Sequence, residues 1–149
     1  MGIFSRPKAN SYVTVKGKGN KSEAEIVVRL MRAGYNVLRP CWEDSRYDLV
    51  IEDGDGKFWR VQCKTAWLEA HRAVLRFNAH SLDRKHNKIS YRDQIDYFAV
   101  YSPDTDKVYF IHVNEVPPTS APYLRLEPPQ KGMTGKYPRE IRYAADYEL

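Results

Sequence analysis

The sequence predicts a single α+β (α/β) domain built on a central mixed β-sheet flanked by helices. The order of elements is the first observation: one amphipathic helix precedes three short strands, a variable middle and a later hairpin. The length is the second, because 149 residues suit one domain. The third is a composition of 42% hydrophobic and 29% charged residues, which is typical of globular proteins.

The first predicted element is a helix from Ser22 to Ala33. Ser22 and Glu25 have the S-x-x-E spacing of a capping box at a helix start. Gly34 stands where a glycine commonly ends a helix. At 100° per residue, the apolar stripe of this helix consists of Ile26, Val27, Leu30 and Met31.

Short strands follow the helix. A strand at 36–39 ends at Pro40, and the strands 47–52 and 58–64 enclose a hairpin turn at Asp53-Gly54-Asp55-Gly56. A second hairpin turns at Pro103-Asp104-Thr105-Asp106. The strands of this second hairpin are predicted at 97–101 and 108–112. Three further strands are predicted at 73–77, 123–127 and 141–143.

Basic residues are concentrated near the N-terminus. The chain carries a net charge of +5 and has a pI of about 9.2. No acidic residue precedes Glu23, although the same stretch holds Arg6, Lys8, Lys16, Lys18 and Lys21. We therefore predict a basic, irregular or extended arm at 1–18, followed by a single domain at 19–149.

Two further basic stretches lie at 72–92 and 131–142. Basic segments beside a charge-balanced body suit a phosphate backbone, and the alternative is an ordinary solvated surface. Among the aromatic residues, Tyr91 is the strongest candidate for a DNA contact because it adjoins Arg92 in a basic stretch. The candidate nucleic-acid contacts are Lys16, Lys18, Lys21, Arg72, Arg76, Arg84, Lys85, Lys88 and Arg92.

Several classes of protein are disfavoured. Cys41 and Cys63 form no C-x-x-C pair, which argues against a disulfide framework and a cysteine-rich zinc site. No apolar run approaches the roughly 18 residues of a membrane span, and the first residues lack the apolar core of a secretory signal. We expect an intracellular, cytoplasmic protein with no membrane partner.

Polar side chains alternate along the two strands of the first hairpin. Asp48 lies on one face of its strand, and Gln62 and Lys64 share one face of the next. A short hairpin loop places Asp48 across from Gln62 or its neighbour, at a side-chain separation of about 5 Å. The three side chains are thus expected to converge. The alternative is an exposed polar face with a cross-strand Asp–Lys pair.

Glu23 falls within the apolar stripe of the predicted helix, one turn before Val27. Glu25, by contrast, lies on the opposite side and can pair with Arg29 at i,i+4. The alternative interpretation of Glu23 is a first-turn acid favoured by the helix dipole. Oxygen donors beside a lysine make a site for a hard cation such as Mg²⁺, suited to phosphoryl chemistry.

The helix glutamate, Tyr47-Asp48 and Gln62-Cys63-Lys64 together resemble the PD-(D/E)XK nuclease superfamily. Gln62 replaces the usual acidic residue, and this Q-x-K variant is similar to the group I intron-encoded PD-(D/E)XK homing endonucleases. The likeness spans most of the chain after Lys18. It is carried by GYNVLRP, YDLVIEDGDG, VQCKTA, DYFAVYSPDTDKVYFIHV and RYAADYEL.

The resemblance implies a restriction-endonuclease-like fold and a role for each residue of the motif. Glu23 and Asp48 would bind Mg²⁺, with Mn²⁺ able to substitute, and Gln62 would offer its side-chain carbonyl. Cys63 or Val61 would add a backbone carbonyl, and Lys64 would be the catalytic lysine. The sequence departs from the strict motif because Gln62 brings no charge and because Tyr47 replaces proline.

The resemblance further implies an Mg²⁺-dependent DNA endonuclease that makes homing-type, sequence-specific double-strand cuts. A Holliday junction resolvase is an alternative, because archaeal resolvases share the fold, the size and the basic arm. A catalytically inactive DNA-binding module is another. Double-stranded or branched DNA is the expected partner, and paired active sites imply a homodimer or homotetramer.

Overall fold

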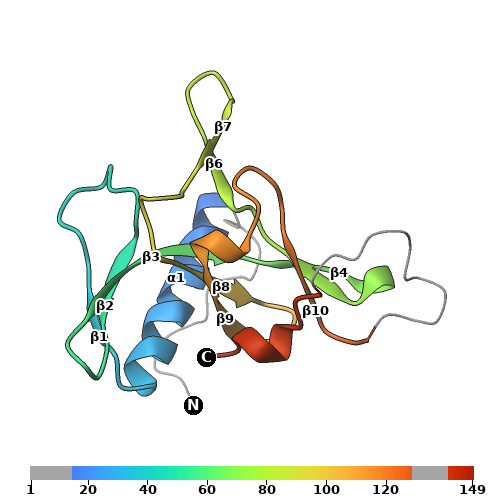
Figure 1. Cartoon of the computed structure of the whole chain (residues 1–149), viewed down its shortest axis with the longest axis horizontal. Helices are drawn as coiled ribbons and strands as arrows, with labels where there is room; N and C mark the ends of the chain where they lie inside the picture. Colours follow the sequence, from blue (N-terminus) through green and yellow to red (C-terminus); the bar gives the residue numbers. More distant parts are fainter. Residues whose placement is uncertain (1–14, 129–140) are drawn as a thin grey trace, which may run out of the picture.

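The structure is a computed structural model that describes residues 15–128 and 141–149 (Figure 1). The basic residues Arg6, Lys8, Lys131, Lys136 and Arg139 of the predicted arm and third stretch lie outside these ranges. Within them, no helix is long and apolar enough to cross a membrane.

A five-stranded sheet with the order β1-β2-β3-β8-β9 forms the centre of the fold. All neighbouring strands run antiparallel except β3 and β8, which are parallel. The prediction of a central mixed sheet is therefore confirmed. The strands are β1 (Asn36–Leu38), β2 (Leu49–Glu52), β3 (Phe58–Thr65), β8 (Tyr97–Ser102) and β9 (Lys107–His112).

Between β3 and β8 the chain makes a long excursion. It forms β4 (Trp67–Glu69), η1 (Ala70–Arg72) and β5 (Val74–Arg76), and then a two-stranded hairpin of β6 (His80–Leu82) and β7 (Lys88–Ser90). This hairpin projects away from the rest of the molecule (Figure 1). The sequence predicted β5 but not β4, β6 or β7.

The C-terminal third adds short pieces. η2 (Val113–Glu115) follows β9, β10 (Tyr123–Arg125) pairs with β5 to complete a three-stranded sheet in the order β10-β5-β4, and η3 (Ala144–Tyr147) is the last helical turn. The predicted strand 123–127 is thus shorter than expected. The predicted strand 141–143 is reduced to a single bridge between Tyr143 and Arg125.

The α-helix α1 (Val15–Arg32) is the only one in the described ranges, so the sheet is not flanked by several helices as expected. It begins seven residues before Ser22, and the predicted capping box is wrong. Ser22 is an interior residue, 3% exposed, whose Oγ accepts a hydrogen bond from Thr65 Oγ1 at 2.6 Å. The prediction omitted the first turns of α1 because they contain Gly17 and Gly19, and glycine has a low helix propensity.

The central sheet is covered on both faces. Ile26 and Leu30 of α1 are fully buried against Leu49, Val61 and Ala99 on one face. Met31, the last residue of the predicted apolar stripe, is 62% exposed, so the buried part of the stripe ends at Leu30. The other face packs against the three-stranded sheet and the segment that leads into β8, through a cluster that includes Leu75, Phe77, Tyr91, Phe98 and Leu124.

Candidate active site

The turn between β2 and β3 sets the register of the predicted site. Asp53 Oδ1 accepts hydrogen bonds from the backbone N–H groups of Asp55 (3.0 Å) and Lys57 (2.9 Å), and Gly56 takes a φ of 77°. Such side-chain-to-backbone bonds and a left-handed glycine define a tight turn. Leu49 consequently faces Val61, so the next pair along the ladder is Asp48 and Gln62.

Asp48 and Gln62 meet as the sequence predicts. Asp48 Oδ2 accepts a hydrogen bond from Gln62 Nε2 and a second one, of 2.7 Å, from the backbone N–H of Cys63. The first bond joins the two strands across the hairpin, and the second fixes the carboxylate against the backbone of β3. Asp48 is thus held at a single position at the mouth of the hairpin.

The negative charge of Asp48 is unfavourable in its partly buried position. Burial raises the pKa of this carboxyl above its usual range, and the neighbouring Glu23 raises it further, whereas the Cys63 N–H and Lys64 lower it. Burial, with Asp48 and Glu23, also raises the pKa of the Cys63 thiol well above normal. The thiol is therefore neutral, so Cys63 acts here through its main chain.

Glu23 reaches the site from α1. Its side chain is 27% exposed and accepts a hydrogen bond from the guanidinium of Arg39, just beyond β1. Glu25 instead pairs with Arg29 at 3.5 Å, as predicted for the i,i+4 pair. The two glutamates of the first helix therefore have different roles, and Glu23 is the one that lies near Asp48.

Lys64 lies on the same side of β3 as Gln62 but does not pair directly with Asp48. Its Nζ donates to Tyr91 Oη at 3.2 Å and lies 4.7 Å from the centre of the Tyr91 ring. The predicted alternative, a cross-strand Asp–Lys pair, is thus replaced by an ammonium held on a neutral aromatic residue. The effect of Lys64 on the pKa of Asp48 places both in one electrostatic environment.

Asp48 and Glu23 line an open pocket of about 670 Å³. The first half of α1 forms one wall, and the loop between β1 and β2 forms another. Trp42 in that loop is 73% exposed, so a large aromatic surface is available beside the two carboxylates. The other lining residues are Lys16, Asn20, Ala24, Arg39, Pro40, Glu43, Ser45 and Tyr47.

Sequence reasoning missed three residues at the site and misjudged a fourth. Arg39 and Trp42 line the pocket, and Arg46 places its guanidinium 4.4 Å from the centre of the Tyr91 ring. Tyr91 itself is only 6% exposed, so its prediction as a DNA contact is wrong and its ring is an internal support. The position of Arg46 two residues before Asp48 was the one signal available.

The predicted nucleic-acid contacts fall into separate groups. Lys16, Lys18 and Lys21 are located on the first turns of α1, and Lys16 lines the site pocket. Three others, Arg84, Lys85 and Lys88, are exposed on the β6–β7 hairpin.

The remaining three predicted contacts have partners within the protein. Arg76 donates to Glu69 Oε1 (3.2 Å) and to the backbone carbonyl of Ala121 (2.9 Å). Arg72 lies 3.8 Å from Glu69, and Arg92 donates to the backbone carbonyl of Val116 at 3.2 Å. Their role as DNA contacts stays a prediction.

In the described part of the chain, no three Asp, Glu, His or Cys side chains are grouped closely enough to hold a metal ion. The composition of the site explains this result. Of the side chains predicted to bind the metal, Asp48 and Glu23 are carboxylates, and the third oxygen donor belongs to the amide of Gln62, which is not an acidic group. Carboxylate and amide oxygens together still form the donor set that a hard cation such as Mg²⁺ accepts.

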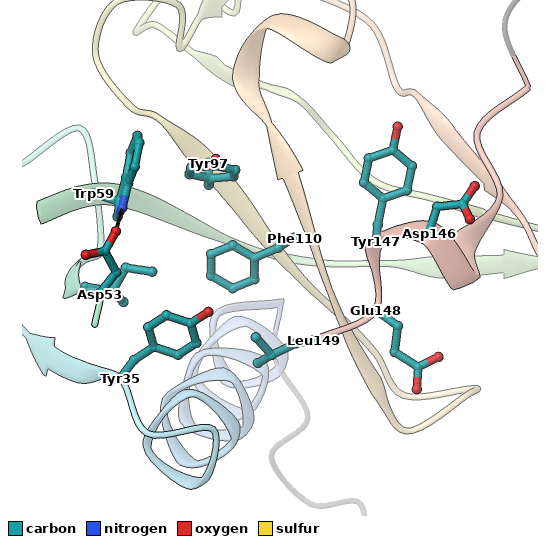
Figure 2. Close-up of a pocket in the computed structure, with 10 residues that line it drawn as sticks. Tyr35, Asp53, Trp59, Tyr97, Phe110, Asp146, Tyr147, Glu148 and Leu149 are labelled. Carbon is teal, nitrogen blue, oxygen red and sulfur yellow. Dashed lines mark hydrogen bonds between the residues drawn. The ribbon is translucent and has the colours of Figure 1, made fainter. Parts of the chain in front are cut away.

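A second pocket, of about 420 Å³, lies elsewhere and shares no lining residue with the first (Figure 2). Tyr35, Tyr97, Phe110 and Trp59 gather there beside the C-terminal residues, and Trp59 Nε1 donates to Asp53 at 2.8 Å. This contact supports the β2–β3 turn from outside and so helps to hold the register that brings Asp48 to Gln62.

A mixed sheet carries an aspartate at a hairpin, a Q-x-K segment on the next strand and a glutamate from the covering helix, which is the arrangement expected from the resemblance to PD-(D/E)XK nucleases. The PD-(D/E)XK endonuclease family matches residues 13–149. The chain therefore belongs to this family and is an endonuclease.

The fold is shared with a solved structure. The bacterial homing endonuclease I-Ssp6803I superimposes with a TM-score of 0.63 at 19% identity, over 91% of this chain and 86% of that one. No curated protein matches the chain.

Proposed function

We propose that this protein is an Mg²⁺-dependent DNA endonuclease that makes sequence-specific, homing-type double-strand cuts, with Mn²⁺ able to replace Mg²⁺. The convergence of Asp48, Gln62 and Lys64 on one hairpin, with Glu23 beside them, carries the proposal. The carboxylates of Asp48 and Glu23 line an open pocket of about 670 Å³, which leaves room for a substrate beside them. The likeness to a homing endonuclease supports the homing-type interpretation.

The donor set suits a divalent cation. Asp48 and Glu23 would bind it through carboxylate oxygens, Gln62 through its amide oxygen, and Cys63 or Val61 through a backbone carbonyl. The raised pKa of Asp48 reflects a desolvated carboxylate beside another acidic group, an arrangement that a cation stabilises. When bound, the metal would lower the pKa of a water and neutralise charge that develops on phosphorus.

The residues of the chain would perform the remaining work. Lys64 donates its hydrogen bond to a neutral tyrosine, so its charge remains available to the scissile phosphate or to the attacking water. Glu23 is paired with Arg39 in this structure, and a cation beside Asp48 would compete with Arg39 for that carboxylate. Arg39 is 58% exposed, so it can turn toward a DNA phosphate when released.

The basic residues of α1 and of the β6–β7 hairpin would position the DNA over the pocket. Lys16 lines the pocket, Lys18 and Lys21 lie on the same first turns of α1, and Arg84, Lys85 and Lys88 lie on the hairpin whose base Arg46 holds. Contacts of this kind bind the phosphate backbone and set the register without reading sequence. Two such sites in a homodimer or homotetramer would cut both strands.

A gel assay tests the proposal. Purified protein is incubated with Mg²⁺ and either a library of linear duplexes or a four-way junction, and Asp48→Ala serves as the inactive control. We expect double-strand cuts at one sequence in the linear DNA, and retention of DNA binding by Asp48→Ala in Ca²⁺.

Three other outcomes contradict the proposal in different ways. Preferential cutting of the junction would favour a resolvase instead. Binding without cutting in any divalent metal would indicate an inactive module. Wild-type cleavage by Asp48→Ala would refute the site assignment.

A further inference from the structure

Arg46 connects the candidate site to the projecting hairpin. It lies two residues before Asp48, and its guanidinium donates to Ser81 Oγ in β6 at 2.9 Å and to the backbone carbonyl of Ser90 in β7 at 3.2 Å. It also donates to the side chain of Gln94, just beyond β7. One side chain therefore holds both strands of the β6–β7 hairpin at their base.

The same guanidinium stacks on Tyr91. Its central carbon lies 4.4 Å from the centre of the ring, a distance at which a cation is attracted to an aromatic face. Tyr91 is 6% exposed and meets Phe98 of β8 edge-on, with ring centres 5.7 Å apart. The core fixes one side of this ring while Arg46 holds it from the hairpin base.

Lys64 is held by this ring. Its Nζ lies 3.2 Å from Tyr91 Oη and 4.7 Å from the ring centre. A carboxylate in that place would cancel the lysine charge. A neutral hydroxyl and an aromatic face position the ammonium without neutralising it, as a group that must meet a phosphate requires.

We propose that Tyr91 is a positioning residue for Lys64 and that Arg46 couples this position to the β6–β7 hairpin. DNA held by Arg84, Lys85 and Lys88 on the hairpin would then order Ser81 and Ser90 at its base, and through Arg46 the ring that carries the lysine. Lys64 would then be placed correctly only when DNA is bound correctly on the hairpin. This inference rests on the proposed function and adds to it a coupling between substrate contact and chemistry.

Substitutions separate the parts of this network. Tyr91→Phe keeps the ring and removes only the oxygen that accepts from Lys64, whereas Tyr91→Leu removes the ring as well. Arg46→Gln breaks the hold on both the hairpin and the ring. Tyr35→Phe is the matched control, because it also deletes one tyrosine hydroxyl but lies in the second pocket. Each variant is assayed for DNA affinity in Ca²⁺, single-turnover cleavage in Mg²⁺ and thermal stability.

The network predicts a particular division of effects. Tyr91→Phe should cut about tenfold more slowly, since the variant lacks one hydrogen bond to a charged group. Its DNA affinity should stay within about twofold of wild type, because the substitution leaves every basic side chain that faces a phosphate in place. Tyr91→Leu should be slower still, so that phenylalanine partly rescues the rate. Arg46→Gln should lower both the cleavage rate and the DNA affinity. Added to Tyr91→Leu, it should cause no further fall in the cleavage rate.

The opposite pattern overturns the inference. Folded Tyr91 variants that cleave at the wild-type rate, or whose affinity falls while the rate is unchanged, would show that the ring does not position the lysine. The control Tyr35→Phe should match wild type throughout.

A spectroscopic measurement keeps the inference testable if no DNA is cut. Lysines are reductively ¹³C-methylated, and the Lys64 signal is assigned by its disappearance in Lys64→Arg. The Tyr91 ring should displace this signal, and Arg46→Gln should move it, while Tyr91→Leu should abolish the displacement. An undisplaced Lys64 signal in the wild type would refute the inference whatever the activity. Absence of cleavage with the displacement intact would refute the proposed function alone.

Discussion

Asp48 sits where its charge is unfavourable to the fold. Burial and the nearby Glu23 raise its pKa, so the folded protein binds its proton more tightly than the unfolded chain does. Between the ordinary aspartate pKa of about 3.9 and the raised value, stability therefore falls as the pH rises. Above both values the full cost of the buried charge is present.

Replacement of Asp48 by asparagine should consequently stabilise the metal-free protein at neutral pH. We expect Asp48→Asn to raise Tm by about 3 °C at pH 7, a modest shift for a chain of this length. The gain should shrink as the pH falls below the raised pKa of Asp48, because the wild-type carboxyl is then protonated in the folded protein. Calorimetry in EDTA at several pH values measures this, and a gain that is constant with pH would exclude a charge effect.

Gln62→Glu tests whether the amide of Gln62 faces a metal ion. The two side chains are nearly the same size, but the glutamate adds a full negative charge beside Asp48. If Gln62 is a ligand, this charge should lower the Mg²⁺ concentration for half-maximal cleavage by about tenfold. The quantity is measured for both proteins on the same DNA. An unchanged half-saturation concentration, with cleavage intact, would remove Gln62 from the site.

At the scale of elements, the basic surface of the β6–β7 hairpin should account for part of the DNA affinity. Replacement of Arg84, Lys85 and Lys88 by glutamine should weaken binding and reduce the slope of log affinity against log salt by about 0.9 for each phosphate that is no longer neutralised. Titrations at several salt concentrations measure the slope. Arg32→Gln, at the far end of α1 from Lys16, is the control and should leave the slope unchanged.

Elements that depend on neighbours in sequence were predicted well. The β2–β3 hairpin followed from the D-G-D-G turn and from strand alternation, and with it came the meeting of Asp48 and Gln62. The start of α1 was missed because Gly17 and Gly19 have a low helix propensity and the residues around them are polar. β4, β6 and β7 were missed because none of these three-residue strands has a buried residue, whereas β5, which is equally short, has two and was predicted.

The supports of the site were harder to predict for a related reason. Tyr91 is 27 residues beyond Lys64, and the two meet only because β3 and β8 pair. Arg46 reaches Ser81 and Ser90 across 35 and 44 residues. Nothing in the local pattern specifies such contacts, so the sequence identified the residues of the motif but not the ones that hold them.

For the whole molecule, two active sites should act on one DNA. A mixture of wild-type subunits with excess Asp48→Ala subunits, co-refolded to exchange them, should convert double-strand cuts into nicks, because most assemblies that retain any working site then hold only one. Supercoiled plasmid distinguishes nicked from linear product, and light scattering gives the oligomeric state. Cleavage of both strands at an undiminished ratio would indicate that one site cuts twice.

The parallel pairing of β3 and β8 obliges the chain to leave the sheet after Thr65 and return at Tyr97. Asp48 and Gln62 are assembled upstream of that departure, on a hairpin whose turn is complete in itself. An exchange of residues 82–88 at the tip of the excursion would therefore leave Asp48 and Gln62 undisturbed, provided that Arg46 and Tyr91 are kept. We therefore expect chimaeras with other tips to keep the cleavage chemistry and to differ from this protein in how tightly they bind DNA.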